Sequence, residues 1–382
     1  MVRLFKNFIP KIILLVVSTI ICFLILEMYF RFTELKYSDS NLKVFKSIYP
    51  DSPNSIYEFK SNFKGTVKRP DFNMTIETGE HGFRLPAPNK IDDIELLVMG
   101  DSFTLGWGVQ GNERYGYLFG QQTGLKTLVA SYPNGITTLH YYKFFLLNKS
   151  FQPSHIIVGS YLGNDFYLDI NETVILNNEP FDMALPYRWI DRHGRLRSKG
   201  VLKSEFLENL NKNSFFFKKL INYFINTKNW GLFLVQDKLR MISHISKKFD
   251  KGGPTPQAEL AMDYLVRLEK ECKARNPECK LYTLLIPEAH YVEDYNPSWS
   301  KHVKAVKERF ENGKSTALSY VLDGCEKRKL NCLNPTAALR KAEAGGTPMH
   351  FENDKHWSPA GNAVATSFLC RKIEGLTCNQ ND

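Results

Sequence analysis

The sequence lacks several patterns that mark common classes of enzyme and binding site. It contains no Gly-x-Ser-x-Gly, which excludes the nucleophile elbow of α/β-hydrolases. It also has no Cys-x-x-Cys, so zinc and thioredoxin-like sites built on that spacing are excluded. Its nine histidines are scattered without a ligand cluster, and there are no internal repeats. We therefore expect neither a catalytic metal nor a cofactor.

One long apolar run is present, at residues 12–26, and it carries no charge. Three basic residues precede it, as they do in both signal peptides and membrane anchors. The residues that follow, EMYFRFTELKY, are bulky, whereas a signal peptide has small residues before its cleavage site. We therefore expect a retained transmembrane helix at 12–32, with a cleaved signal peptide as the alternative. The basic residues place the tail at 1–11 in the cytoplasm and the rest of the chain outside it.

Six of the seven cysteines occur as close couples along the chain. The couples are Cys272 with Cys279, Cys325 with Cys332, and Cys370 with Cys378. Disulfides across these couples would close small loops and would persist only in an oxidising compartment such as a bacterial periplasm. Six cysteines allow 15 connectivities, so other pairings stay open. Six buried thiols are the remaining alternative.

The positive charge of the chain is concentrated in one segment. Residues 188–251 hold 15 Lys and Arg against 5 Asp and Glu, an excess equal to the net charge of +10. Nucleic acid is a poor partner for a domain that faces outward. An anionic membrane surface or an anionic lipid-linked or polymeric substrate fits better. A solvated helical face is an equally good explanation of the same residues.

Strand and helix patterns alternate along most of the chain. Apolar runs predict strands at 94–100, 126–131, 155–162 and 280–287, and helices are expected at 114–124, 138–150, 256–275, 300–311, 314–323 and 359–371. This alternation predicts an α/β domain with a parallel sheet between helices. We assign its two parts to residues 91–169 and 252–382, with a tether at 33–90 and a basic helical insertion at 170–251.

Residues suited to chemistry follow several of these strands, where parallel sheets bind their ligands. Ser102 can attack an ester, His356 can take its proton, and Asp354 can hold the histidine in the correct tautomer. The backbone N–H groups of Ser102 and Gly135 and the side-chain amide of Asn164 can form an oxyanion hole.

Each assignment has an alternative. Ser102 also fits a plain turn, His350 is a rival base, and Gly124 competes with Gly135. Arg84 could contact an anionic substrate, although a structural salt bridge is the better interpretation.

These blocks resemble the SGNH hydrolase superfamily, also called the GDSL family. Gly100-Asp101-Ser102 matches its first block, Gly135 its glycine block, and Asn164-Asp165 its third, although Leu162 stands where a glycine is usual. The spacing Asp354-x-His356 is one residue shorter than the usual Asp-x-x-His and is similar to that of polysaccharide O-acetyltransferase relatives. The resemblance covers residues 94–170 and 347–370, and implies a flavodoxin-like three-layer α/β/α sandwich.

The resemblance and the apolar run together predict a function. We expect a membrane-anchored, extracytoplasmic serine esterase that removes an O-acyl group, such as acetyl, from a carbohydrate or a lipid-linked ester. An O-acyltransferase working with envelope polysaccharide machinery would use the same residues. A non-catalytic envelope protein on a decayed hydrolase scaffold is the third hypothesis, favoured by Leu162 and the basic insertion.

Overall fold

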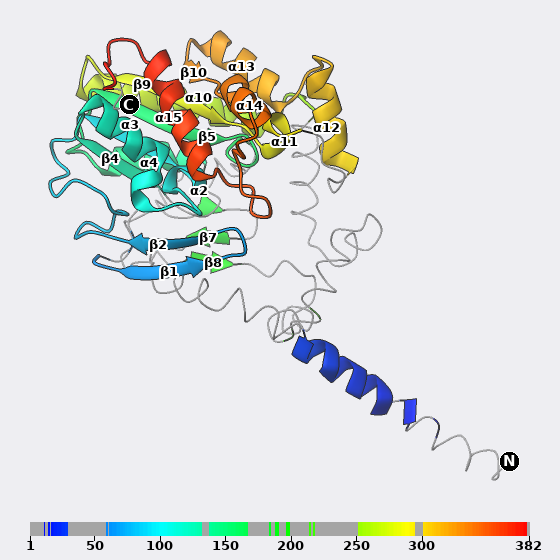
Figure 1. Ribbon diagram of the computed structural model, residues 1–382. Coiled ribbons are helices and arrows are strands. Elements are labelled where there is room, and N and C mark those ends of the chain that lie inside the picture. The colour runs from blue at the N-terminus through cyan, green and yellow to red at the C-terminus, as the bar shows by residue number, and fades with distance from the viewer. Residues whose placement is uncertain are drawn as a thin grey trace. The chain divides into compact units, whose positions relative to one another are not determined.

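The computed structural model describes the following parts of the chain: 11, 14–15, 17–29, 59, 61–131, 137–166, 183–184, 188–190, 196–198, 214, 217, 251–294 and 301–379. Two units divide the chain. One comprises Met1–Lys43 and Lys199–Arg240, and the other Val44–Ser198 and Met241–Asp382. The larger unit contains the predicted α/β domain (Figure 1).

Five parallel strands form the central sheet. In chain order they are β3 (Leu96–Gly100), β4 (Thr127–Ser131), β5 (His155–Tyr161), β9 (Lys280–Ile286) and β10 (Asn331–Leu333). Their spatial order is β10-β9-β5-β3-β4. Counted along the chain this is the order 2-1-3-4-5, which characterises flavodoxin-like sheets. The α/β class and the parallel sheet predicted from the sequence are therefore confirmed.

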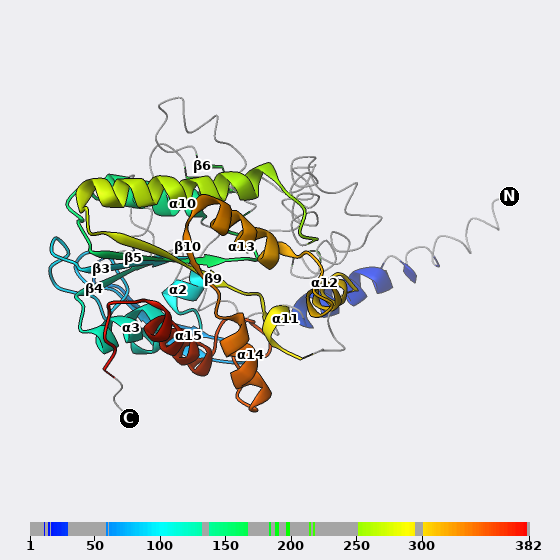
Figure 2. The same cartoon turned by 90° about the horizontal axis from the view of Figure 1, so that it is seen from above.

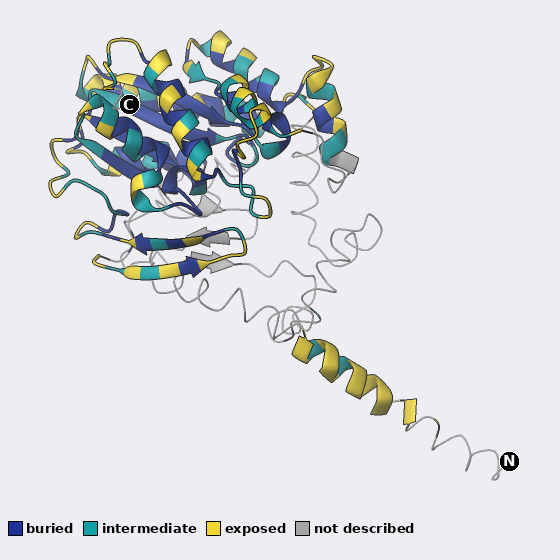
Figure 3. Ribbon diagram, in the orientation of Figure 1, coloured by how far each residue is buried: buried dark blue, intermediate teal, exposed yellow. Residues whose placement is uncertain are grey.

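Alternate residues of each strand enter two separate cores. Leu97 and Met99 of β3 belong to one hydrophobic cluster, while Leu96 and Val98 belong to the other. The first cluster receives α4 (Thr138–Leu147), α10 (Pro256–Arg275) and α13 (Ala317–Arg328). The second receives α3 (Tyr115–Thr123), α14 (Thr336–Ala344) and α15 (Pro359–Lys372). Helices therefore cover both faces, and the strands are buried between them (Figures 2 and 3).

Local sequence signals explain where the helices begin. Thr255 caps α10 by accepting the N–H of Ala258, and Ser358 caps α15 by accepting that of Gly361. In both helices a proline follows the cap, where a missing N–H costs nothing. Further helical elements of this unit are α2 (Ser102–Leu105), η1 (Gly111–Glu113), α11 (Ala289–Val292) and α12 (Lys301–Glu311).

The region expected to be a tether contains an antiparallel hairpin that the sequence analysis did not predict. Strands β1 (Lys64–Lys68) and β2 (Asn73–Glu77) pair with each other. Val67, Met74 and Ile76 are fully buried and belong to the first hydrophobic cluster. Each strand has only five residues, so its alternation of buried and exposed side chains was too brief to stand out.

The insertion predicted to be helical also contains strands. β6 (Met183–Ala184), β7 (Arg188–Ile190) and β8 (Leu196–Ser198) form a small antiparallel sheet, which the sequence did not predict. Most of the remaining insertion lies outside the described residues.

The smaller unit includes a helix at residues 17–29. Several of its large apolar side chains are exposed, among them Ile20, Leu24 and Met28. Across the described residues, no helix combines the length and apolar character needed to cross a membrane. The anchor therefore stays a prediction.

Each of the three cysteine couples is joined as a disulfide. Cys272–Cys279, Cys325–Cys332 and Cys370–Cys378 have Cα separations of 5.8, 6.1 and 5.8 Å, within the range that a disulfide requires. The predicted local pairing is therefore confirmed. Cys22 is a free thiol.

Candidate active site

Ser102 lies directly after β3 and begins the short helix α2. Asp101 caps this helix by accepting the N–H of Phe103 at 2.9 Å. Burial raises the pKa of Asp101 to about 6, against the opposing effects of the Phe103 N–H and the charge of His356. Gly100 has no room for a Cβ, because Thr104 and the carbonyl of Gly159 on β5 lie too close. This tight turn leaves Ser102 at the carboxyl end of the sheet, between β4 and β5.

The histidine and the acid approach Ser102 on the loop between α14 and α15. His356 Nε2 lies 2.8 Å from Ser102 Oγ, and His356 Nδ1 is hydrogen-bonded to Asp354 Oδ1. Ser102 is thus brought into one hydrogen-bonded series with Asp354 and His356, which the sequence also predicted and which lie more than 250 positions later in the chain. His350 faces Glu293 instead, with 3.7 Å between His350 Nδ1 and Glu293 Oε1.

The charge of Asp354 decides which nitrogen of His356 carries the proton. Burial raises the pKa of Asp354, but hydrogen bonds from His356 and Trp107 and the charge of His356 outweigh it and leave that pKa below its usual value. Asp354 is therefore a carboxylate at neutral pH and can only accept, so Nδ1 must donate to it. Nε2 is then free to accept the hydroxyl proton of Ser102.

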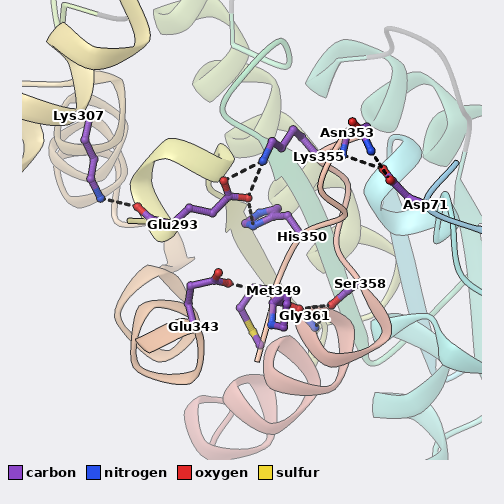
Figure 4. Close-up of polar contacts among 11 residues, drawn as sticks. Asp71, Glu293, Lys307, Glu343, Met349, His350, Asn353, Lys355, Ser358 and Gly361 are labelled. Atoms are coloured by element: carbon purple, nitrogen blue, oxygen red, sulfur yellow. Dashed lines mark hydrogen bonds and ion pairs between the residues drawn. The ribbon is translucent and has the colours of Figure 1, made fainter. Parts of the chain in front are cut away.

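Contacts from distant segments hold the loop that carries both residues. An antiparallel bridge between His350 and Trp357 closes its base. Asp71, in the turn of the β1–β2 hairpin, accepts the backbone N–H groups of Asn353 and Asp354 at 2.8 and 2.9 Å. At the other side, Glu293 accepts Lys355 Nζ at 2.9 Å (Figure 4). The hairpin is thus part of the site's support.

Arg84 supports the loop that follows Ser102. Its buried guanidinium donates to the carbonyls of Leu105, Gly106, Val109 and Thr75, at 2.6 to 2.9 Å. Burial lowers its pKa to about 10, so it remains charged at neutral pH. Both sequence-based interpretations, a salt bridge and a substrate contact, are therefore replaced by a clamp on backbone carbonyls.

The predicted oxyanion donors are only partly described. Asn164 lies after β5, the neighbour of β3, so it is at the same edge of the sheet as Ser102. Asp165 holds this turn by accepting the Tyr141 hydroxyl at 2.6 Å and the Tyr161 N–H at 3.1 Å. Leu162, in the usual glycine position, is fully buried. Gly135 lies outside the described residues.

Sequence reasoning missed two residues that contact the acid. Trp107 Nε1 donates to Asp354 Oδ2 at 3.2 Å, and Asp71 binds the backbone of Asp354. The contacts span 247 and 283 positions. No local pattern marks such a pairing, although Trp107 lies only five residues after Ser102. Groups of residues able to hold a metal are absent from the described parts of the chain.

A buried histidine near the predicted glycine block leads to a pH prediction. His140 Nδ1 accepts the N–H of Thr137 at the start of α4, and burial, helped by the charge of Lys143, lowers its pKa to about 3. The unfolded chain binds a proton there below about pH 6.5, but the folded chain does not. Stability is therefore lost as the pH falls below 6.5, by about 2 kcal/mol at pH 5 from this group.

His140→Gln should remove that part of the pH dependence, because glutamine can accept the same N–H without titrating. The measurement is the free energy of unfolding in urea at pH 7.5 and pH 5. His81→Gln, at an exposed histidine, is the control and should behave as the wild type does. Equal pH dependence in His140→Gln and wild type would contradict the prediction.

No protein-family model and no curated protein matches the sequence. Solved structures do match. An extracellular lipase from Streptomyces rimosus is 10% identical, with TM-score 0.39, covering 73% of this chain and 99% of its own. An acetylxylan esterase from Geobacillus stearothermophilus, solved as a catalytic mutant, is 11% identical with TM-score 0.37, covering 76% and 98%.

A member of the lipolytic G-D-S-L family from Veillonella parvula is 8% identical with TM-score 0.33, covering 74% of this chain and 98% of its own. Because these values are low, our assignments rest on the strand order and on the contacts of Ser102. The chain is an α/β protein with a flavodoxin-like strand order and a Ser102–His356–Asp354 series at its carboxyl edge, similar in structure to solved G-D-S-L lipolytic proteins and esterases.

Proposed function

We propose that the protein is a serine esterase of the SGNH superfamily that removes an O-acyl group from a carbohydrate or a similar ester. The observation that carries the proposal is the 2.8 Å contact between His356 Nε2 and Ser102 Oγ, with Asp354 on the other nitrogen. A serine that only forms a turn does not require a histidine and a carboxylate beside its hydroxyl. A carboxylate-oriented imidazole next to a hydroxyl is the arrangement that activates a serine nucleophile.

Catalysis follows from these contacts in two halves. Ser102 Oγ attacks the ester carbonyl carbon while its proton moves to His356 Nε2, and Asp354 stabilises the imidazolium that forms. When the C–O bond breaks, the same nitrogen protonates the leaving alcohol, and an acyl-serine remains. Water then attacks the acyl-serine and gives its proton to Nε2, which passes it to Ser102 Oγ as the acyl–oxygen bond breaks and the acid is released.

The negative oxygen of each tetrahedral intermediate needs fixed donors. We assign them to the N–H groups of Ser102 and Gly135 and to the amide of Asn164. The position of Asn164, at the edge of the sheet beside β3, supports this assignment. Loss of one such donor costs about 10²- to 10³-fold in kcat.

An active-site probe tests the proposal. A fluorophosphonate should label the full-length protein at Ser102, because the activated hydroxyl attacks the electrophilic phosphorus. His356→Ala should abolish labelling, since the base is lost. Peptide mass spectrometry of the adduct gives the position. Wild-type protein that stays unlabelled under conditions that label a known serine esterase would support the non-catalytic scaffold hypothesis instead.

Transfer of the acyl group is the second candidate function, favoured by the Asp354-x-His356 spacing. A sugar hydroxyl would then replace water in the second half of the reaction, since both can attack the same acyl-serine. Incubation with an aryl acetate carrying a labelled acetyl group, with and without a polysaccharide acceptor, separates the two. Label on the polysaccharide indicates transfer, and label only in free acetate indicates hydrolysis.

The location we propose is the outer side of the cytoplasmic membrane, with the catalytic domain in the periplasm. The exposed apolar side chains of helix 17–29 suit contact with lipid. The three disulfides suit an oxidising compartment. The substrate would be an ester of the cell envelope, either a carbohydrate or a lipid-linked molecule, and nucleic acid is not expected to bind.

A further inference from the structure

The carboxylate of Asp354 receives two donors, one on each oxygen. His356 Nδ1 contacts Oδ1, and Trp107 Nε1 donates to Oδ2 at 3.2 Å. A carboxylate held by one donor can rotate about its Cβ–Cγ bond, because that torsion is broad and roughly two-fold. A second donor on the other oxygen removes this freedom. Trp107 therefore helps to fix the orientation of the Asp354 carboxylate, which in turn orients His356.

The protein holds Trp107 firmly in place. Its backbone N–H donates to the carbonyl of Ser102 at 2.9 Å, so it closes the turn that carries the nucleophile. The preceding Gly106 has φ +73°, a left-handed conformation that favours glycine. The Arg84 guanidinium binds the carbonyls of Leu105 and Gly106 just before it. Its backbone therefore belongs to the nucleophile loop, while its indole reaches the acid.

Packing restricts the indole ring as well. Trp107 is 8% exposed. Trp107 packs edge-to-face on Phe72, with 6.0 Å between the ring centroids and an interplanar angle of 81°. Its ring also lies 6.3 Å from that of His356. A ring held on two sides presents its N–H in one direction, which is what a fixed donor requires.

We propose that Trp107 is a positioning residue of the Ser102–His356–Asp354 series, whose indole N–H holds Asp354 Oδ2 so that Oδ1 faces His356 Nδ1. The inference rests on the proposed esterase function but adds a residue to it. The backbone of Trp107 belongs to the turn that carries Ser102, and its indole binds Asp354. One residue therefore fixes the position of the acid relative to the nucleophile.

An asparagine at position 354 makes the role of Trp107 measurable. Its amide must place either its oxygen or its NH₂ opposite His356 Nδ1. While the Trp107 N–H is present, it attracts the amide oxygen and repels the NH₂. The NH₂ therefore faces Nδ1, which must become an acceptor, and the proton moves to Nε2. In that tautomer His356 cannot take the proton of Ser102.

Removing the indole N–H should allow the asparagine amide at position 354 to rotate by about 180° about its Cβ–Cγ bond. We expect Trp107→Phe alone to lower kcat about 10-fold, consistent with loss of a hydrogen bond to a charged group. In the Asp354→Asn background the same change should raise kcat about 10-fold or more, because the asparagine oxygen can then accept from Nδ1. A residue that only supports the fold would lower the rate in both backgrounds.

Trp357→Phe is the matched control. Trp357 is also buried and is adjacent to His356, but within the described parts of the chain its indole N–H has no hydrogen-bond partner. In the Asp354→Asn background it should give no rescue. Replacing Trp107 with benzothienylalanine, which has sulfur in place of the N–H, keeps the ring size and covers the case in which Trp107→Phe does not fold.

The histidine tautomer provides a readout independent of activity. In ¹⁵N NMR, Asp354→Asn should carry the His356 proton on Nε2, and the variant that also lacks the Trp107 N–H should carry it on Nδ1. An unchanged tautomer, together with no rise in kcat, would overturn the role of Trp107. Failure of the esterase proposal looks different, because Ser102→Ala would then leave the wild-type rate unchanged while the tautomer shift could still occur.

Discussion

Ser102→Ala should lower kcat/KM for a small aryl acetate by about 10⁴- to 10⁶-fold, as expected when a serine nucleophile is removed. The physical reason is that Ser102 Oγ is the hydroxyl placed 2.8 Å from His356 Nε2. Without it, water must attack the ester directly, helped only by the oxyanion donors. The measurement is steady-state hydrolysis with the full-length protein, followed by the release of the aryl alcohol.

A second serine offers a control at the same edge of the sheet. Ser131 ends β4, pairs with Gly100 in the sheet and is buried, and its hydroxyl has no hydrogen-bond partner among the residues that the structure describes. Ser131→Ala should therefore leave kcat/KM within a few-fold of wild type. If Ser102→Ala retains the wild-type rate, the serine mechanism is wrong, whatever the geometry of the three side chains.

Asp354→Asn should lower kcat by about 10⁴-fold while the folded structure persists, because the wrong tautomer of a catalytic histidine has an effect of this size. The loss arises because the amide places a donor opposite His356 Nδ1, and not only because the negative charge is removed. The Trp107 N–H favours the amide oxygen on its own side, which leaves the NH₂ facing His356 Nδ1. His356 then has its proton on the nitrogen that should accept from Ser102.

This prediction is checked by kcat measured alongside a thermal unfolding curve. Asp323→Asn, on the exposed face of α13, makes the same chemical change away from the site and should leave kcat unchanged. A loss of less than 10-fold in Asp354→Asn would mean that Asp354 does not orient His356. A variant that is inactive because it is unfolded is recognised by its melting curve and is then replaced by Asp354→Glu in the same assay.

The support of the acid also explains why the hairpin before the sheet matters. Asp71 binds the backbone of Asn353 and Asp354 from the turn between β1 and β2, and Arg84 binds the loop after Ser102. Both residues come from the part of the chain expected to be a tether. The catalytic series is therefore supported by residues outside the sheet that carries it.

Much of the fold could be predicted because the relevant signals are local. The run at 94–100 is a continuous apolar stretch, and the structure places β3 at Leu96–Gly100, buried at every position. The helix expected at 256–275 begins and ends as predicted, since Thr255 and Pro256 mark its start. β10 was missed because three residues are too few to show a period, and α14 at Thr336–Ala344 was also not predicted.

By itself, the sequence predicted the α/β class, the local disulfide pairing, and Ser102, Asp354 and His356 as candidate site residues, because the signals for each lie in short local stretches. Only the tertiary structure decided the strand order, the clamp formed by Arg84, and the contact of Trp107 with Asp354. These depend on pairs of residues separated by 9 to 247 positions. Such pairs come into contact only when the strands assemble into the sheet. A single sequence does not show which distant side chains will be in contact.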